Sequence, residues 1–228
     1  FAPFATRHMH EFGTTREMLA SVAVKNHYNG ARDPYAHFQN EITVDDVLKS
    51  QPVCHPLHLL DCCPQTYGAA AVLLVSAERA REFTDKPVYV AGFGVATDHP
   101  YLHEKDSFTE IKVTRMASQR AYAMAGIGPG DIDCAEVHDC FTITEILDIE
   151  DLGFFEKGDG GRASLEGETA LTGRLPVNTS GGLLAKGHPI GATGVAQITE
   201  CWWQLRGEAG ERQIETRNGY ALQHNAGG

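Results

Sequence analysis

The sequence contains no long apolar run, no excess of basic residues and no signal-peptide pattern, and each of these observations disfavours a class of function. No apolar segment approaches the roughly 20 residues that a membrane-spanning helix needs, so we expect no membrane span. The formal net charge is −11, which disfavours nucleic-acid binding because that requires a basic surface. The 42% hydrophobic and 21% charged residues are typical of an ordinary globular protein.

Six cysteines are present without the charged and apolar segments of a signal peptide. We therefore do not interpret them as a disulfide framework, and we expect a reducing, cytoplasmic compartment. Cys54, His58 and Cys62 have a spacing that would align three metal ligands on one face of a helix. Three prolines nearby would break that helix and no fourth ligand is evident, so we predict small buried cysteines and no metal site.

Both ends of the sequence favour a piece of a longer protein. The chain begins Phe-Ala-Pro without methionine, and it stops at Gly227-Gly228 directly after an expected strand over 220–223. We therefore expect that residues essential to its function lie outside it.

Residues 1–65 have an irregular pattern with one clear helix. Thr14-Thr-Arg-Glu17 has the form of a capping box, and the apolar positions after it follow helical spacing to about Asn29-Gly30. A weaker signal, Thr43-Val-Asp-Asp46, predicts a short helix to Lys49. The segment has no strand pattern, and we interpret it as a lid or insertion whose many histidines are mostly exposed.

From residue 68 onward, strands and helices are expected to alternate. The apolar run Gly68–Ser76 predicts a strand buried on both faces, a short helix follows over 77–83, and Asp85-Lys86-Pro87 is the clearest boundary in the chain. Further strands are predicted at 88–96, 135–138, from 177 onward and at 218–224, with a glycine-rich loop at 158–173. Helices are predicted from capping boxes at Ser107 and Thr142 and after Pro189. This alternation predicts an α/β fold with helices on both faces of a sheet.

The glycine-rich stretch 178–194 contains His188 directly before Pro189. We expect Pro189 to be the first residue of a helix, which would place His188 at a helix mouth that favours negative charge. Three glycines of this stretch would let the backbone approach a ligand closely: Gly181, Gly182 and Gly187. The pattern suits a reaction that develops an oxyanion, and a phosphate loop or a plain strand-to-helix turn are the alternatives.

Two further polar clusters follow predicted strands. His138-Asp139-Cys140 follows the strand over 135–138, and His224-Asn225 follows the last strand. Polar residues at the carboxyl ends of parallel strands gather at one crevice, so together with His188 they would supply an acid/base thiol, a polarising imidazole and oxyanion donors. Taken singly, each cluster is also explained by a capped histidine or a small buried cysteine.

Four motifs occur together: His138-Asp-Cys-Phe141, Asn178-Thr-Ser-Gly-Gly182, Gly187-His-Pro-Ile-Gly-Ala-Thr-Gly194 and His224-Asn-Ala-Gly-Gly228. With them, and with Leu60-Asp-Cys-Cys-Pro64 before Gly68-Ala-Ala-Ala71, the chain resembles the thiolase superfamily. Within it, the chain is similar to sterol-carrier-protein-2-type thiolases and acetyl-CoA acetyltransferases, a group that includes thiolase-like lipid-transfer proteins. One departure is Tyr67, because relatives usually have Asp just before the Gly-Ala-Ala-Ala run.

The resemblance implies a layered α-β-α-β-α sandwich, of which only the loop domain and the C-terminal half are represented. It implies a loop or lid domain over residues 1–65 and the end of the N-terminal half over 66–85. The C-terminal half would cover 86–228 and stop before its last strand.

The resemblance implies an acyl-CoA C-acyltransferase that cleaves or condenses 3-oxoacyl-CoA through a cysteine thioester, in lipid or steroid side-chain metabolism. The nucleophilic cysteine would lie in the N-terminal half, outside this chain. His188 would activate it, Cys140 would move the α-proton, and His138 would help to form an oxyanion hole. His224 would stand where many thiolases have a second reactive cysteine. We also expect His138 and a helix N-terminus to favour the thiolate of Cys140.

The resemblance further implies coenzyme A thioesters as substrates, no covalently bound cofactor and a homodimer. Substrate-binding residues would be Asn178, Ser180, Gly181, Gly182 and Gly187. One alternative is a thiolase-like aldolase that cleaves a β-hydroxyacyl-CoA of a steroid side chain, often with a small OB-fold partner of the DUF35 type. A second alternative is a non-catalytic lipid-transfer subunit.

Overall fold

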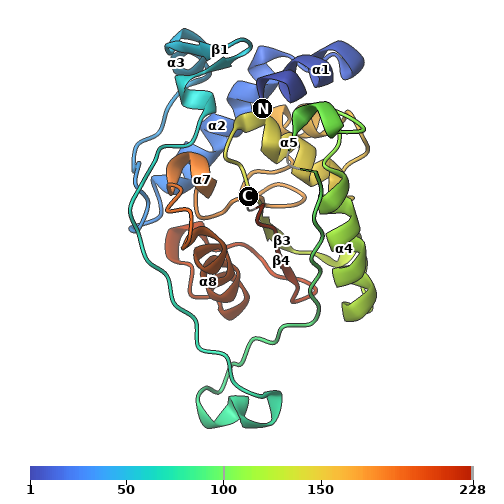
Figure 1. Cartoon of the computed structure of the whole chain (residues 1–228). Helices are drawn as coiled ribbons and strands as arrows, with labels where there is room; N and C mark the ends of the chain where they lie inside the picture. The colour runs from blue at the N-terminus through green and yellow to red at the C-terminus, as the bar shows by residue number, and fades with distance from the viewer. Residues whose placement is uncertain (100, 227–228) are drawn as a thin grey trace.

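The computed structural model describes residues 1–99 and 101–226 (Figure 1). The first 65 residues form three helices and a small antiparallel hairpin. These elements are α1 (Ala2–Phe12), α2 (Arg16–Gly30), α3 (Val44–Lys49), β1 (Pro52–Cys54) and β2 (Leu57–His58). Helix α1 was not predicted, because it begins without a capping side chain.

The predicted helix starts in this segment are close to the observed ones. Helix α2 is capped by Thr15, whose hydroxyl accepts a hydrogen bond from Met18 N at 3.3 Å, and it ends at Gly30 as expected. The neighbouring Thr14 hydroxyl instead lies 2.6 Å from His8 Nδ1. The capping box at Thr43 and α3 are confirmed.

Helix α2 packs against three later helices, α5 (Thr142–Asp151), α6 (Gly160–Leu165) and α7 (Gly182–Ala185). Its side chains share a core with Phe4 of α1 and with Ile143, Ile146 and Leu184 from the second half of the chain. This core joins residues on both sides of the predicted boundaries at 65 and 85. The expectation that histidines in this segment are mostly exposed is wrong for His8 and His27, which are buried.

The second half is built around a short parallel sheet. Strands β3 (Cys134–Glu136) and β4 (Ala221–Gln223) pair with Cys134 opposite Ala221, and Val177 joins Ala135 through a single parallel bridge. In Figure 1 the pair lies between α8 (Thr193–Arg206) and α4 (Lys112–Ala125). Three of the predicted strands are thus neighbours, although each is shorter than expected.

The remaining helices connect these elements. Helix α5 (Thr142–Asp151) begins where predicted, but its first turn is closed by the Thr144 hydroxyl, which accepts from Phe141 N at 3.1 Å. Helix α4 begins at Lys112 and not at Ser107, whose hydroxyl caps only a local turn at Thr109. The loop at 158–173 contains α6 (Gly160–Leu165), and α7 (Gly182–Ala185) precedes His188.

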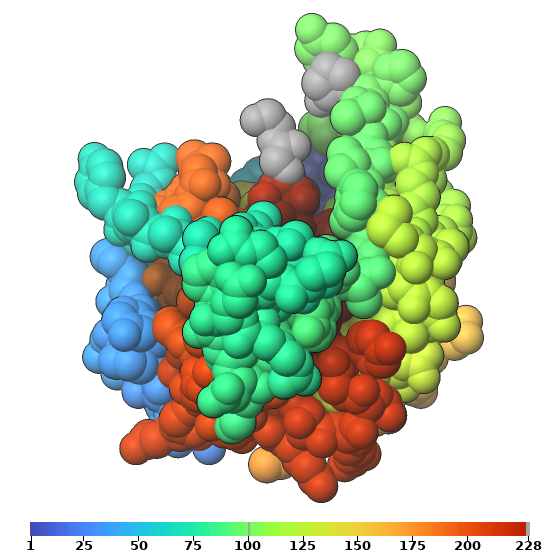
Figure 2. Space-filling model, turned by 90° about the horizontal axis from the view of Figure 1, so that it is seen from below, coloured from blue at the N-terminus to red at the C-terminus, as the bar shows by residue number. Residues whose placement is uncertain are grey.

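The strands predicted at 68–76 and 88–96 are not formed, and the helix expected at 77–83 is a 3₁₀ segment, Ala77–Glu82. Their apolar side chains are largely exposed, with Leu73 at 76% and Val90 at 73%. Figure 1 shows this region as a long connection that leaves the main body, and in Figure 2 it covers the middle of the lower face. An apolar run becomes a strand only beside a neighbour that takes its hydrogen bonds, and no described residue pairs with these two runs.

None of the helices within residues 1–99 and 101–226 is long and apolar enough to span a bilayer. Residues 52–58 form the β1–β2 hairpin, so Cys54 and His58 are not on a helix, as the prolines predicted. Among residues 1–99 and 101–226, no three His, Cys, Asp or Glu side chains lie close enough together to hold a metal ion.

Candidate active site

Three predicted site histidines lie at the carboxyl edge of the short sheet. His138 follows β3, His224 follows β4, and His188 lies in the loop between α7 and α8. The imidazole rings of His138 and His188 are 5.0 Å apart between centroids and meet edge to face at 87°. The structure therefore brings together residues that are 50 positions apart in the sequence, as the strand-end argument predicted.

Each of these two imidazoles is oriented through its Nδ1 atom. His138 Nδ1 is 2.8 Å from the Asn225 side-chain oxygen, and His188 Nδ1 is 2.8 Å from the Thr193 hydroxyl. Within residues 1–99 and 101–226, neither Nε2 atom has a hydrogen-bond partner. The two Nε2 atoms are therefore the ring positions left for proton transfer or for contact with a substrate.

Both imidazoles favour the uncharged form. Burial lowers the pKa of His138, and the hydrogen bond to the Asn225 oxygen and the Asp148 carboxylate offset this only in part. Burial also lowers the pKa of His188, with further lowering from His138 and the Lys186 ammonium group. A neutral imidazole accepts a proton at one nitrogen while it donates from the other, as a general base requires.

His224 has different surroundings. Its Nε2 is 3.0 Å from the Thr114 hydroxyl on α4, and its Nδ1 is 3.3 Å from Asp148 on α5. Burial opposes a charge on this ring, but the Asp148 carboxylate outweighs it, and the pKa of His224 is raised. His224 therefore favours the charged form, in contrast to His138 and His188.

Cys140 lies at the start of α5 and is buried, with 8% of its surface exposed. Its Sγ is 3.8 Å from the Thr144 hydroxyl. Burial raises the pKa of the Cys140 thiol, and negative charge at Asp148 and Asp139 raises it further. The expectation of positive surroundings that favour a thiolate is therefore wrong, and Cys140 is a protonated thiol at neutral pH.

The Asn178 and Ser180 side chains are fully buried and hydrogen-bonded within the protein. Asn178 has a left-handed backbone, with φ of 55°, which asparagine tolerates better than most residues. Its side chain accepts from Val137 N at 2.9 Å and donates to Glu145 at 2.7 Å, while the Ser180 hydroxyl donates to Glu136 at 2.6 Å. These contacts fix the loop, and the predicted substrate-binding role of both residues stays a prediction.

The glycines of the same loop are required by contacts within the protein. Gly181, Gly182 and Gly187 all have positive φ. A Cβ at Gly182 would overlap the Asp139 carboxylate, and one at Gly187 would lie 2.8 Å from Thr66 Cγ2. Whether these glycines also border a bound substrate stays a prediction.

The expectation that Pro189 begins a helix is wrong. Its carbonyl accepts from Ala192 N at 2.7 Å and from Thr193 N at 3.1 Å, which makes a turn, and α8 begins only at Thr193. His188 is therefore not at the mouth of the helix. It is instead tied to Gln65 through a parallel bridge. Tyr67, two residues further on, is fully exposed.

A buried network around Asp139 and Glu145 supports the loop, and the sequence reasoning missed it. Asp139 accepts from Leu183 N at 2.7 Å, and Glu145 forms an ion pair of 2.7 Å with Lys25 of α2. Asn26 joins the two carboxylates through hydrogen bonds of 2.7 and 2.9 Å. Burial and the neighbouring Glu145 raise the pKa of Asp139 to about 7. The only signal in the sequence was the placing of Lys25 and Asn26 next to the apolar face of a helix.

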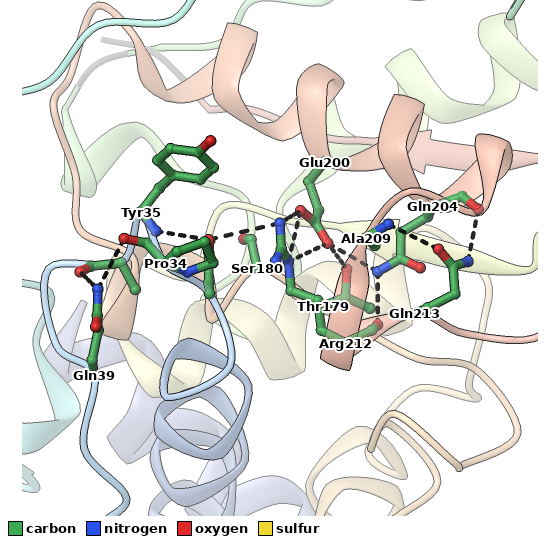
Figure 3. Close-up of polar contacts among 12 residues, drawn as sticks. Pro34, Tyr35, Gln39, Thr179, Ser180, Glu200, Gln204, Ala209, Arg212 and Gln213 are labelled. Atoms are coloured by element: carbon green, nitrogen blue, oxygen red, sulfur yellow. Dashed lines mark hydrogen bonds and ion pairs between the residues drawn. The ribbon is translucent and has the colours of Figure 1, made fainter.

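A second buried network holds the other side of the loop (Figure 3). Arg212 donates to both oxygens of Glu200 at 2.9–3.0 Å, and Glu200 accepts from Thr179 at 2.9 Å. Burial, together with Glu200, raises the pKa of Glu136 to about 7. A surface cavity of about 560 Å³ beside this network is lined by residues 31–35, Gln39, Trp203 and residues 208–212, and by none of the histidines of the site.

The short parallel sheet with imidazoles and a thiol at its carboxyl edge defines an α/β protein of the thiolase-like fold. The profile of the family described as thiolase C-terminal domain-like matches residues 94–228, which is more than half of the chain. The chain belongs to this thiolase family.

Individual relatives agree with this assignment. The chain is 53% identical over 228 residues to an acetyl-CoA acetyltransferase of Methanothermobacter thermautotrophicus, covering 100% of this chain and 59% of that protein. It is 40% identical to sterol carrier protein 2 of Oryctolagus cuniculus over 232 residues, covering 100% of this chain and 42% of that protein. A solved structure titled Ltp2-ChsH2(DUF35) aldolase superposes with a TM-score of 0.81 at 33% identity, over 91% of this chain and 55% of that one. The chain thus spans about 40–60% of the length of these relatives.

Proposed function

We propose that the chain is part of an acyl-CoA C-acyltransferase that cleaves or condenses 3-oxoacyl-CoA through a cysteine thioester. The observation that carries this proposal is the edge-to-face pair of His138 and His188, in which His138 precedes the protonated thiol of Cys140 by two residues in the chain. The archaeal relative named acetyl-CoA acetyltransferase supports it, since it is 53% identical over the whole chain. The nucleophilic cysteine would come from residues outside this chain.

In the cleavage direction, the neutral His188 imidazole takes the proton of the nucleophilic cysteine as its sulfur attacks the 3-oxo carbon. The oxygen of that carbon becomes an oxyanion and then reforms the carbonyl as the bond to the α-carbon breaks. The electrons of the broken bond form an enolate, which the Cys140 thiol protonates at the α-carbon. The resulting Cys140 thiolate takes the proton of the incoming coenzyme A thiol, whose sulfur attacks the acyl-cysteine. The nucleophilic cysteine leaves as a thiolate and recovers the proton that His188 holds.

The protonated state of Cys140 matches this direction, because its first task is to donate a proton. Its burial also makes the later thiolate a strong base, since the same burial that raises its pKa increases its proton affinity. His138 would help to form the oxyanion hole through a water molecule, because its Nδ1 donates to the Asn225 oxygen and its neutral Nε2 therefore accepts a hydrogen bond. That water would donate its second hydrogen to the thioester oxygen. His224, held by Thr114 and Asp148, would lie at the edge of the site and assist His138 in stabilising the thioester oxyanion.

The test measures cleavage of acetoacetyl-CoA by the protein in its full-length form, with and without added coenzyme A. Acyl transfer requires coenzyme A, and we expect His188→Ala to lower kcat by at least roughly a hundredfold, as removal of a general base does. His10→Ala is the matched control, because His10 is an exposed histidine on α1. Turnover in His188→Ala equal to that of the control would refute the role of His188.

One second function is favoured by a specific observation. The aldolase structure matches with a TM-score of 0.81 at 33% identity, so a lyase that cleaves a β-hydroxyacyl-CoA of a steroid side chain is the alternative. Such a reaction needs no incoming coenzyme A thiol. Cleavage of a β-hydroxyacyl-CoA in the absence of free coenzyme A would therefore identify the aldolase. A lipid-transfer subunit would show neither activity.

The wider setting follows from the same proposal. We propose a homodimer that acts on coenzyme A thioesters in lipid or steroid side-chain metabolism, with a small OB-fold protein of the DUF35 type as partner in the aldolase alternative. All six cysteines are free, which supports a cytoplasmic location. We also propose that residues 1–65 form the loop domain, that residues 66–85 are the end of the N-terminal half, and that residues 86–228 belong to the C-terminal half.

A further inference from the structure

The loop that carries His188 also contains Lys186, whose ammonium nitrogen is buried. This nitrogen has no hydrogen-bond partner within residues 1–99 and 101–226. The Lys186 backbone is fixed on both sides, because its N–H donates to Gly182 O at 2.9 Å and its carbonyl accepts from His37 N at 3.0 Å. These contacts fix the backbone from which the side chain extends, two residues before His188.

An unpaired buried ammonium group is costly, so its retention requires an explanation. The acidic groups near it have other partners. Glu136 accepts from Thr179 and Ser180, and Asp33 accepts from Tyr35 N and lies 3.7 Å from Arg212. Among residues 1–99 and 101–226, the ammonium group of Lys186 is thus left without a direct counter-ion.

We propose that Lys186 is a positioning residue of the acyl-transfer site, whose buried ammonium group is a fixed positive charge for the anion that forms when the thioester reacts beside His138 and His188. This inference rests on the proposed function. The same charge keeps the two imidazoles neutral between turnovers, because a second positive charge beside Lys186 is unfavourable. The oxyanion and the enolate formed by a 3-oxoacyl thioester would be stabilised without a direct hydrogen bond.

The two imidazoles face charged groups on several elements around them. His188 faces His138 after β3 and Lys186 on its own loop. His138 faces Asp148 of α5 and His224 after β4, in addition to Lys186. Asp148 is the carboxylate that acts on His138, and the charged His224 opposes it. Removal of Lys186 therefore takes away a positive charge that acts on both rings.

The first experiment follows the titration of His138 and His188 by NMR in the full-length protein labelled with ¹³C at histidine Cε1. Signals are assigned with His138→Gln and His188→Gln. We expect both midpoints to move to higher pH in Lys186→Met and in Lys186→Gln, and to stay unchanged in Lys186→Arg. Lys49→Met, which removes an exposed lysine of α3, is the control and should change neither. Unmoved midpoints in folded Lys186→Met would overturn the proposal, as would loss of the fold in both neutral variants, since Lys186 would then be structural.

The second experiment measures the pH profile of acetoacetyl-CoA cleavage. We expect Lys186→Met to lower kcat by roughly tenfold with little change in KM, and to move the acidic limb of the profile to higher pH. Lys186→Arg should restore both kcat and the position of the acidic limb. Equal kcat and an unmoved limb in Lys186→Met would contradict the role in catalysis. The titration does not require turnover, so an inactive wild-type protein would refute the proposed function while the NMR result still tests Lys186.

Discussion

Replacing Lys25 with methionine tests the buried network that supports the catalytic loop. The Lys25 ammonium group is 2.7 Å from Glu145 and donates to Val177 O at 2.7 Å, and both charged side chains are buried. Methionine has a similar length and removes only the charge and its hydrogen bonds. Glu145 would then remain as a buried carboxylate next to Asp139, with only the amide groups of Asn26 and Asn178 as partners.

Breaking one side of a buried ion pair costs about 3–5 kcal/mol, because the remaining charge stays desolvated. The lost hydrogen bond to Val177 O belongs to the same change, so we expect the free energy of unfolding to fall by about 3–5 kcal/mol in total. The value is measured by urea unfolding followed by circular dichroism at pH 7. The matched control is Lys49→Met, which should leave the stability unchanged because the pair of Lys49 with Asp45 is exposed and screened by solvent.

A second variant separates the ion pair from simple packing. Lys25→Met combined with Glu145→Leu removes both charges, and we expect it to recover part of the stability that Lys25→Met loses, because no unpaired carboxylate remains. Lys25→Met within about 1 kcal/mol of the wild type would refute the assignment of Lys25 as the counter-ion of Glu145. The single variant Glu145→Leu completes the comparison. A double variant that is less stable than the summed effects of Lys25→Met and Glu145→Leu predict would also refute this assignment.

Three further predictions concern the same loop and the histidine beside it. Gly182→Ala should lower the free energy of unfolding more than Gly167→Ala does, by at least about 2 kcal/mol. Both glycines have positive φ, but only a Cβ at Gly182 would meet the Asp139 carboxylate. Urea unfolding of the two variants measures this difference. The pKa of Asp139 is raised to about 7, so its contribution to stability is complete below about pH 4 and is lost as the pH rises through 7. In unfolding curves measured over this pH range, Asp139→Asn should show a smaller fall in the free energy of unfolding than the wild type. The pKa of His224 is also raised, so the destabilisation by His224→Gln should be larger at pH 6 than at pH 9, where wild-type His224 has lost its charge beside Asp148.

The sequence predicted the proximity of His138 and His188 better than it predicted the strands around them. His138 and His224 follow strands that the apolar pattern located, and parallel strands end at one edge of the sheet. The meeting of His138 with His188 therefore followed from the order of elements alone. The runs at 68–76 and 88–96 have the same apolar pattern and are not strands in this chain. Apolar composition predicts burial, but strand formation also depends on a neighbour that the local sequence does not specify.

The charge state of the site could not be predicted either. Cys140 follows a histidine and begins a helix, which suggested a thiolate, but its burial and the Asp139 and Asp148 carboxylates act in the opposite direction. Those carboxylates come from the same motif and from α5, and their distance from the thiol depends on packing. Lys25 was missed for the same reason, because a lysine beside an apolar helix face is usually exposed at its tip.

The measurement that tests the central claim most directly is the mass of the full-length protein after incubation with acetyl-CoA. Acyl transfer predicts an added acetyl group that hydroxylamine removes, formed in the wild type and in His10→Ala but strongly reduced in His188→Ala. An unmodified mass in a protein that still cleaves its substrate would contradict a cysteine thioester, and an adduct formed equally well in His188→Ala would contradict the role given to this histidine.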